Sequence, residues 1–221
     1  MLDIMHLTVV RGGGRMAADS TKERILDISL QLFSQYGFSA VSIRDICGQV
    51  HIKESSVYYH FTNKRAILEE LGNRFEMIAG GLMQRLDDAV AQLQGEGGSG
   101  ISGGAAAEVF FHDYLMDDFC NRYIRLLHME RSGSEAMRQA YDKWIFEEPL
   151  RFQERIFNAL IEKKCIPAAD GEYLALKYYA PIYLFFQRYL LGGELTEAKK
   201  KLFLEKAEEH ITEFFKEMGG V

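Results

Sequence analysis

The chain has 221 residues, of which 48% are hydrophobic and 26% charged, with a formal net charge of −6. These values are ordinary for a globular protein and exclude wholesale disorder. No apolar run reaches the ~20 residues that a membrane span needs. The three cysteines (Cys47, Cys120 and Cys165) are far apart and support neither a disulfide framework nor a zinc site. We therefore expect a cytoplasmic protein in a reducing setting, without a membrane partner.

The first helix signal lies behind a segment with little pattern. Residues 1–18 include the glycine run Gly12–Gly14 and are expected to form a disordered leader. Ser20 and Glu23 then have the spacing of a capping box, in which each side chain satisfies a free backbone N–H at a helix start. Apolar residues follow at helical spacing until Gly37, which suits the left-handed position that ends a helix.

Three further helices are expected before the middle of the chain. Ser42 caps a short helix that ends near residue 50, and His51 stands where the chain must turn through a left-handed conformation. A second short helix spans 54–61. Thr62 and Asn63 then cap a long helix whose apolar positions continue to residue 93.

The second half of the chain also has helical periodicity. Residues 95–104 contain six glycines and predict a flexible break, which no helix crosses. The helices expected after it lie near 105–119, 121–131, 134–165, 170–192 and 195–218. With 3 prolines and no sustained strand-like alternation, the sequence predicts an all-α fold, in which three compact helices lead into a connector and an aromatic-rich bundle.

Two short helices joined by a tight turn, at 42–50 and 54–61, have the pattern of a helix-turn-helix. Val57 and Phe61 lie four residues apart and can face the core, whereas polar and aromatic donors occupy the rest of the second helix. Such donors suit phosphates and base edges. The charge pattern agrees weakly: residues 1–65 carry eight basic and six acidic side chains, and residues 66–221 carry 18 and 26.

The segment ILDISLQLFSQYGFSAVSIRDICGQVHIKESSVYYHFTNKRAIL, residues 25–68, resembles the DNA-binding domain of TetR-type transcriptional regulators. The run SSVYYHF, followed by Asn63, Lys64 and Leu68, carries the resemblance. It implies a helix-turn-helix DNA-binding domain at 19–65 and a helical ligand-binding and dimerisation domain at 66–221. Lys53 precedes the second short helix, and the free N–H groups at the next helix start also favour a phosphate. The expected DNA-binding residues are Arg44, Lys53, Ser55, Ser56, Tyr58, Tyr59, His60 and Lys64.

Two positions depart from the family pattern. His51 replaces the glycine often found in the turn, and Glu54 places a negative charge beside the expected DNA surface. Glu54 either stabilises the start of its own helix or accepts a hydrogen bond from a cytosine amine.

The C-terminal part carries no visible catalytic set. Asp113, Asp117 and Asp118 lie near His112, but this cluster is interpreted as a solvated helix face because no second ligand motif accompanies it. No phosphate loop, serine elbow or Cys/His pair is present. We expect no enzyme activity, no cofactor and no metal; an all-helical enzyme with an aromatic-lined cavity is a distant alternative.

Aromatic residues concentrate in the second part, with 21 of the 27 in residues 66–221. This density favours a cavity for a mostly apolar or aromatic ligand, although most of these rings individually suit a core or an interface. The expected lining residues are Phe110, Tyr114, His128, Trp144, Tyr178 and Tyr179.

The last two long helices fit the role that the resemblance gives them, which is to form the four-helix bundle of a homodimer. The helix at 172–191 is apolar almost all round and is expected to be buried on several sides, with a bend at Pro181. The expected interface residues are Tyr183, Phe186, Ile211, Phe214 and Phe215.

The sequence thus predicts a homodimeric repressor that binds a near-palindromic operator in double-stranded DNA and is released from it by a small-molecule effector. The alternative is a regulator of the same type without a small-molecule effector, which a protein partner controls or which acts constitutively.

Overall fold

The computed structural model describes residues 21–94 and 103–219, and every regular element in these ranges is helical. The predicted all-α fold is confirmed. The leader at 1–18 and the cap at Ser20 lie outside the described residues. In chain order the helices are α1 (Thr21–Tyr36), α2 (Ile43–Val50), α3 (Glu54–His60), α4 (Lys64–Gln94), α5 (Gly103–Phe110), α6 (Asp118–Glu130), α7 (Glu135–Asp142), α8 (Glu148–Glu162), α9 (Gly171–Phe185) and α10 (Glu197–Glu217).

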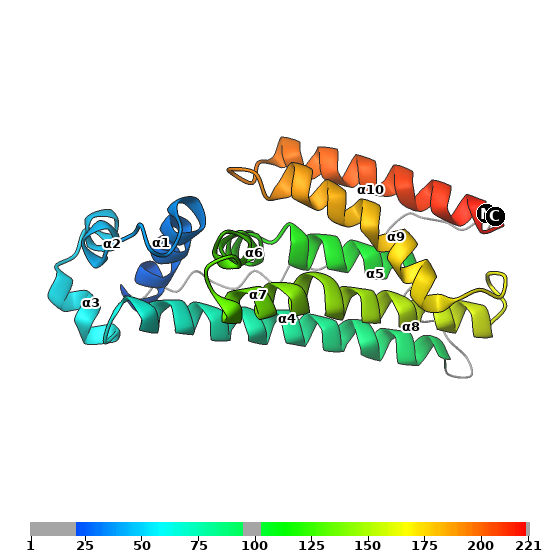
Figure 1. The fold of residues 1–221 in the computed structure, drawn as a ribbon, viewed down its shortest axis with the longest axis horizontal. Helices are drawn as coiled ribbons and strands as arrows, with labels where there is room; N and C mark the ends of the chain where they lie inside the picture. The colour runs from blue at the N-terminus through cyan, green and yellow to red at the C-terminus, as the bar shows by residue number, and fades with distance from the viewer. Residues whose placement is uncertain (1–20, 95–102, 220–221) are drawn as a thin grey trace.

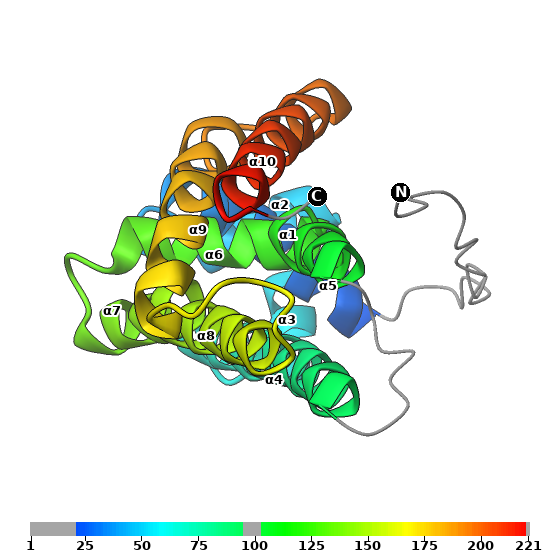
Figure 2. The ribbon, with the colours of Figure 1, turned by 90° about the vertical axis from the view of Figure 1, so that its right-hand side faces the viewer.

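The molecule is elongated, with a small head at one end and a larger body at the other (Figure 1). Helices α1 to α3 form the head, and α4 runs from the head along one side of the body. Helices α5 to α10 form the rest of the body, in which α9 lies between α8 and α10 (Figure 2). The boundary expected between residues 65 and 66 falls within the first turn of α4, so this helix belongs to both parts.

Three π-helical turns modify the expected helices. They span Phe111–Leu115 after α5, Lys143–Glu147 between α7 and α8, and Phe186–Leu190 after α9. The uniform helix expected at 134–165 is therefore two α-helical parts joined by a widened turn. The break expected at 95–104 ends earlier than predicted, because α5 already begins at Gly103.

Helix α9 is less buried than its composition suggests. It continues through Pro181, but Tyr173, Leu176 and Leu184 are 62%, 53% and 60% exposed. The expectation that this helix has no solvent-facing side is therefore wrong for a single protomer. Hydropathy alone did not distinguish burial within one chain from burial between chains.

Tyrosine hydroxyls join the layers of the body. Tyr114 donates to the carbonyl of Trp144 over 2.9 Å, and Tyr179 donates to the carbonyl of Ile145 over 2.8 Å. Both acceptors lie in the π turn between α7 and α8, while the donors come from the π turn after α5 and from α9. Because these groups are buried, each bond satisfies a carbonyl that has no access to water.

Among the described helices, none is long and apolar enough to cross a membrane.

Replacing Tyr179 with Phe is expected to lower the free energy of unfolding by about 1–2 kcal/mol, because the Ile145 carbonyl loses its partner in the core. Urea denaturation followed by circular dichroism measures the change. The control is Tyr173→Phe, at a 62% exposed position of the same helix, which should change stability very little. Equal effects from the two variants would contradict this role of the Tyr179 hydroxyl.

Candidate DNA-binding interface

Helix α2 begins with a reciprocal capping box. The Asp45 N–H donates to Ser42 Oγ over 3.2 Å, and the Ser42 N–H donates to Asp45 Oδ2 over 2.8 Å. The Ser42 hydroxyl also donates to the same carboxylate over 2.6 Å, and this bond is the main reason that the pKa of Asp45 lies below its usual value. The start predicted at Ser42 is confirmed.

The turn between α2 and α3 has the predicted left-handed residue. His51 has φ 59° and ψ 47°, which ends α2 and redirects the chain. The Ile52 N–H then donates a hydrogen bond to the Cys47 carbonyl over 3.1 Å. From α1, Arg24 Nη2 donates to the Val50 carbonyl over 2.8 Å and so caps the end of α2. These bonds fix the direction in which α3 leaves the turn.

Helix α3 has one buried side and one exposed side. Val57 is fully buried, as are Ile46 of α2 and Phe61 just after α3, as the helical spacing predicts. This contact holds α3 against α2, so the opposite side of α3 faces solvent. Tyr59 on that side is 85% exposed, and its ring meets His60 edge-on with centroids 4.9 Å apart.

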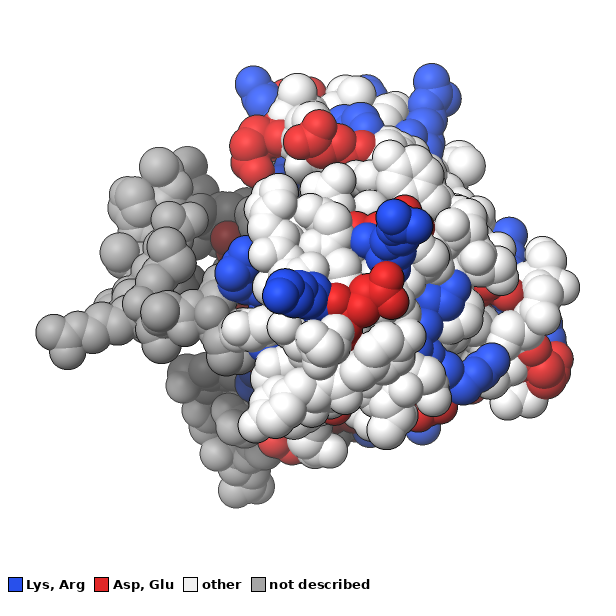
Figure 3. All heavy atoms as spheres, turned by 90° about the vertical axis from the view of Figure 1, so that its left-hand side faces the viewer, with Lys and Arg blue, Asp and Glu red and all other residues white. Residues whose placement is uncertain are grey.

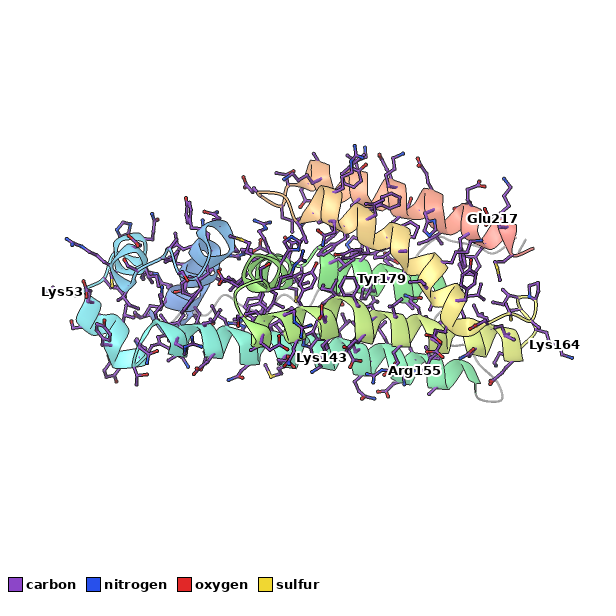
Figure 4. The ribbon with its side chains drawn as sticks, viewed as in Figure 1. Lys53, Lys143, Arg155, Lys164, Tyr179 and Glu217 are labelled. Carbon is purple, nitrogen blue, oxygen red and sulfur yellow. The ribbon has the colours of Figure 1, made fainter. Side chains whose placement is uncertain are left out.

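The predicted DNA-binding residues lie on α2, just before and on α3, and at the start of α4. Figure 4 shows Lys53 at the tip of this end, far from Tyr179 in the body. Five of the eight side chains are exposed and three are half-buried. The exposed ones are Arg44, Lys53, Ser55, Tyr58 and Tyr59, and the half-buried ones are Ser56, His60 and Lys64.

Lys64 is bound within the protein rather than presented to solvent. Its Nζ donates to the carbonyl of Phe38 over 2.7 Å and to that of Val41 over 2.5 Å. The same ammonium lies over the Phe38 ring, 4.3 Å from the centroid. Two of its three donors are therefore used inside the head, and the contact of Lys64 with a DNA phosphate stays a prediction.

Glu130, at the end of α6 in the body, also binds the turn between α1 and α2 that contains Phe38. Its Oε1 accepts a hydrogen bond from the Phe38 N–H over 2.9 Å. Gly37 has φ +84°, and a Cβ at this position would lie 3.1 Å from the Glu130 carboxylate. The left-handed Gly37 is confirmed. Sequence reasoning missed Glu130, because no local signal connects residues 92 positions apart.

Ion pairs extend the contact between head and body. Arg122 of α6 reaches Asp27 of α1 over 3.0 Å, and Lys22 of α1 reaches Glu70 of α4 over 2.6 Å. The outer face of the head is mixed in charge: Figure 3 shows basic side chains among mostly uncharged ones, with acidic side chains between them. This end of the molecule therefore does not present a continuous basic surface (Figure 3).

The comparisons with known proteins agree with this geometry. Residues 25–71 match the family model described as bacterial regulatory proteins of the tetR family. Residues 25–71 are therefore similar to the DNA-binding domain of the tetR family, and the chain shares its fold with solved transcriptional regulators. The family is one of regulatory proteins rather than enzymes.

A curated relative of this chain is the negative transcriptional regulator IcaR of the icaADBC biofilm operon from Staphylococcus aureus, 41% identical over 49 residues. The match covers 22% of this chain and 26% of IcaR, so it spans about a quarter of the relative. Two solved structures share the fold. A transcriptional regulator from Aquifex aeolicus has a TM-score of 0.61 at 18% identity, covering 89% of this chain and 100% of its own. SmeT, the repressor of a Stenotrophomonas maltophilia multidrug efflux pump, has a TM-score of 0.57 at 20% identity, and the match covers 88% of this chain and 90% of SmeT.

The residues predicted to line an effector pocket in this chain lie in three places. Phe110, Tyr114, Trp144 and Tyr179 pack together near Phe75 in the middle of the body. All four are at most 3% exposed. Their rings contact one another directly, and neither of the two hollows that stand out in the described residues lies among them.

The other two predicted lining residues lie elsewhere. Tyr178 packs against Phe157 and Phe214 near α10, and burial raises its pKa. His128 lies toward the head end of the body, where its Nδ1 is 3.2 Å from the Tyr141 hydroxyl. The surface hollows that stand out among the described residues are both near the head. One, of about 540 Å³, lies between α1 and α2 with Arg44 in its wall. The other, of about 240 Å³, lies between α1, α4 and α6.

The predicted dimer residues are partly internal. Phe186 is fully buried within the protomer, and Phe214 is 2% exposed, so neither is available to a second chain in this conformation. Tyr183, Ile211 and Phe215 are half-buried. The exposed apolar side chains on α9 were missed as interface candidates, because the apolar residues lie almost all round this helix and do not show which side faces out of the protomer.

Lys64→Met is expected to lower the free energy of unfolding by about 1–3 kcal/mol, because the Phe38 and Val41 carbonyls lose a charged donor. The control is Lys53→Met, which removes an exposed lysine from the tip of the head and should leave stability nearly unchanged. Thermal and urea denaturation measure both. If Lys64→Met is as stable as the unmodified protein, the Lys64 ammonium does not stabilise the turn between α1 and α2.

Proposed function

We propose that this chain is a homodimeric repressor that places α3 of each protomer in the major groove of a near-palindromic operator. The observation that carries the proposal is the exposed side of α3. A tyrosine that is 85% exposed stands on a short helix whose opposite side is locked into the core. A rigid helix with outward donors is what base recognition requires.

The proposed DNA contacts fall into two groups, those to base edges and those to phosphates. Ser55 and Tyr59 offer hydroxyls at the outer side of α3, where they can reach base edges. Lys53, Tyr58 and Arg44 surround it and can reach phosphates or, for Arg44, a base. Lys64 acts indirectly in this proposal, by fixing the turn that orients α2 and α3.

The exposed apolar stripe of α9 supports the dimer. Tyr173, Leu176, Ala180 and Leu184 recur at three- and four-residue spacing and are exposed. An apolar stripe of this length is unfavourable in water, so a second copy of the same helix is its proposed partner. In such a dimer the two heads would face half-sites about 34 Å apart, one turn of DNA.

Two observations bear on an effector. One solved neighbour is a complex of SmeT with triclosan, with a TM-score of 0.59 and 17% identity to this chain. In this chain, neither of the two hollows that stand out among the described residues lies in the aromatic core, where the effector was expected. This observation favours the alternative of a regulator without a small-molecule effector over release by a purely apolar ligand.

Tyr59→Ala is expected to weaken binding to an operator duplex by about 1–3 kcal/mol without changing stability, because the side chain makes few contacts inside the protein. A duplex selected from a random palindromic pool and fluorescence anisotropy supply the measurement. The control is Tyr36→Ala, a 63% exposed tyrosine at the end of α1. Equal affinities for Tyr59→Ala and the unmodified protein would remove α3 from the DNA interface.

Leu184→Glu is expected to convert the dimer to a monomer, since a charge would be buried in the apolar contact. Operator affinity should fall with it, because one half-site is lost. Met77→Glu is the matched control, since Met77 is 72% exposed on α4, away from the stripe. Analytical ultracentrifugation measures the mass. A Leu184→Glu variant that stays dimeric would exclude the α9 stripe as the dimer surface.

A further inference from the structure

Helix α6 carries three polar residues on one side. Asn121, Arg125 and His128 follow at four- and three-residue spacing, which places them on one face of the helix. Asn121 is fully buried and Arg125 is 9% exposed. Most of the other buried residues of α6 are apolar, among them Ile124 and Leu127, so this face departs from the composition of the core.

Arg125 has an incomplete set of partners. Its Nη2 donates to Asn121 Oδ1 over 3.1 Å, and Asn121 is itself held by a bond from its Nδ2 to the Leu115 carbonyl over 3.0 Å. The Arg125 Nε is sealed from solvent and has no hydrogen-bond partner. Among residues 21–94 and 103–219, no carboxylate lies within ion-pair distance of this guanidinium.

Asp118, the acidic side chain that acts on Arg125, is already ion-paired. Arg122, one turn earlier on α6, binds the carboxylates of both Asp27 and Asp118. Burial and then the charge of Arg122 lower the pKa of Arg125, whereas Asp118 only partly opposes them. Within the described residues, the charge of Arg125 is therefore only partly compensated.

The polar groups farther along α6 do not compensate Arg125, because they satisfy one another. His128 Nδ1 accepts from Arg131 over 2.8 Å and lies 3.2 Å from the Tyr141 hydroxyl. Gln187 donates to the hydroxyls of Tyr141 and Tyr183 over 2.7 and 2.8 Å. These side chains hydrogen-bond to one another, and none of them is acidic.

An unpaired guanidinium in such a place is costly. Removing a charge from water costs several kcal/mol unless an opposite charge and hydrogen bonds replace the solvent, and an apolar side chain of similar volume would avoid that cost. Asn121 also holds the guanidinium in one orientation. The donors of Arg125 that are not bonded to Asn121 include Nε, and a guanidinium can bind the two oxygens of a carboxylate with two parallel hydrogen bonds.

We propose that Arg125 is the anchor for an acidic effector, an organic carboxylate with an apolar aromatic or aliphatic body. A monoanionic carboxylate suits a site among apolar side chains better than a phosphate dianion, which loses more hydration. The inference rests on the proposed regulator function and names the class of its effector. The site lies one turn from the Arg122–Asp27 pair that joins body and head, so an anion there can act on the contact that orients the head.

The test compares matched acids and amides: naphthoate with naphthamide and decanoate with decanamide, with naphthyl phosphate as a third arm. Isothermal titration and thermal shift are measured without DNA on the unmodified dimer, Arg125→Met and Arg125→Lys. At least one carboxylate should bind the unmodified dimer at least about tenfold more tightly than its amide. Arg125→Met should lose that preference, and Arg125→Lys should retain part of it.

The stability of the unliganded variants separates a binding role from a structural one. Arg125→Met should melt at the same temperature as the unmodified protein or higher, because an unpaired buried charge is removed. A lower melting temperature together with no preference for acids over amides would overturn the proposal, as would stronger binding of the phosphate than of both carboxylates.

Operator binding by Arg125→Met, measured by anisotropy, should be unchanged. Its loss in a folded dimer would overturn the assignment of Arg125 to the effector, whereas failure of the unmodified dimer to bind DNA would count against the regulator function itself.

Discussion

The turn between α1 and α2 is the point on which the orientation of the head depends. The carbonyls of Phe38 and Val41 accept from Lys64 at the start of α4, and the N–H of Phe38 donates to Glu130 at the end of α6. One short turn is thus held from the connector and from the body at once. Since α2 and α3 follow directly from this turn, any shift of α6 relative to α4 changes the direction in which α3 points.

The packing of the body favours a discrete shift over a gradual deformation. Its aromatic core is packed, and hydroxyls of Tyr114 and Tyr179 fix the π turn between α7 and α8. Densely packed interiors move between a few arrangements instead of bending continuously. The polar face of α6 is the exception within this core. It lies on the same helix as Glu130, and Arg122 joins that helix to α1. A charge placed at Arg125 would therefore act on the element that holds the head.

Local sequence signals predicted the head well, because its determinants lie within a few residues of one another. The Ser42 cap, the left-handed His51 and the buried Val57 all follow from neighbours in the chain. The body was predicted less well. Composition showed that residues 66–221 are rich in aromatic rings, but not whether those rings surround a cavity, pack solidly or face a second chain. Phe214 and Leu184 are both apolar residues of long helices, and only their neighbours in space make one internal and the other exposed.

By itself, the sequence determined the all-α fold, the helix boundaries of the head and the resemblance of its helix-turn-helix to that of TetR-type regulators. These depend on spacing, capping and turn chemistry, which operate over a few residues. Only the tertiary structure decided that Lys64 binds the turn between α1 and α2, that Glu130 reaches Phe38, and that Arg125 Nε is buried without a hydrogen-bond partner in the described residues. Each of these depends on which charged groups meet across distant segments. A side chain's partners are set by packing, and residue type alone does not specify them.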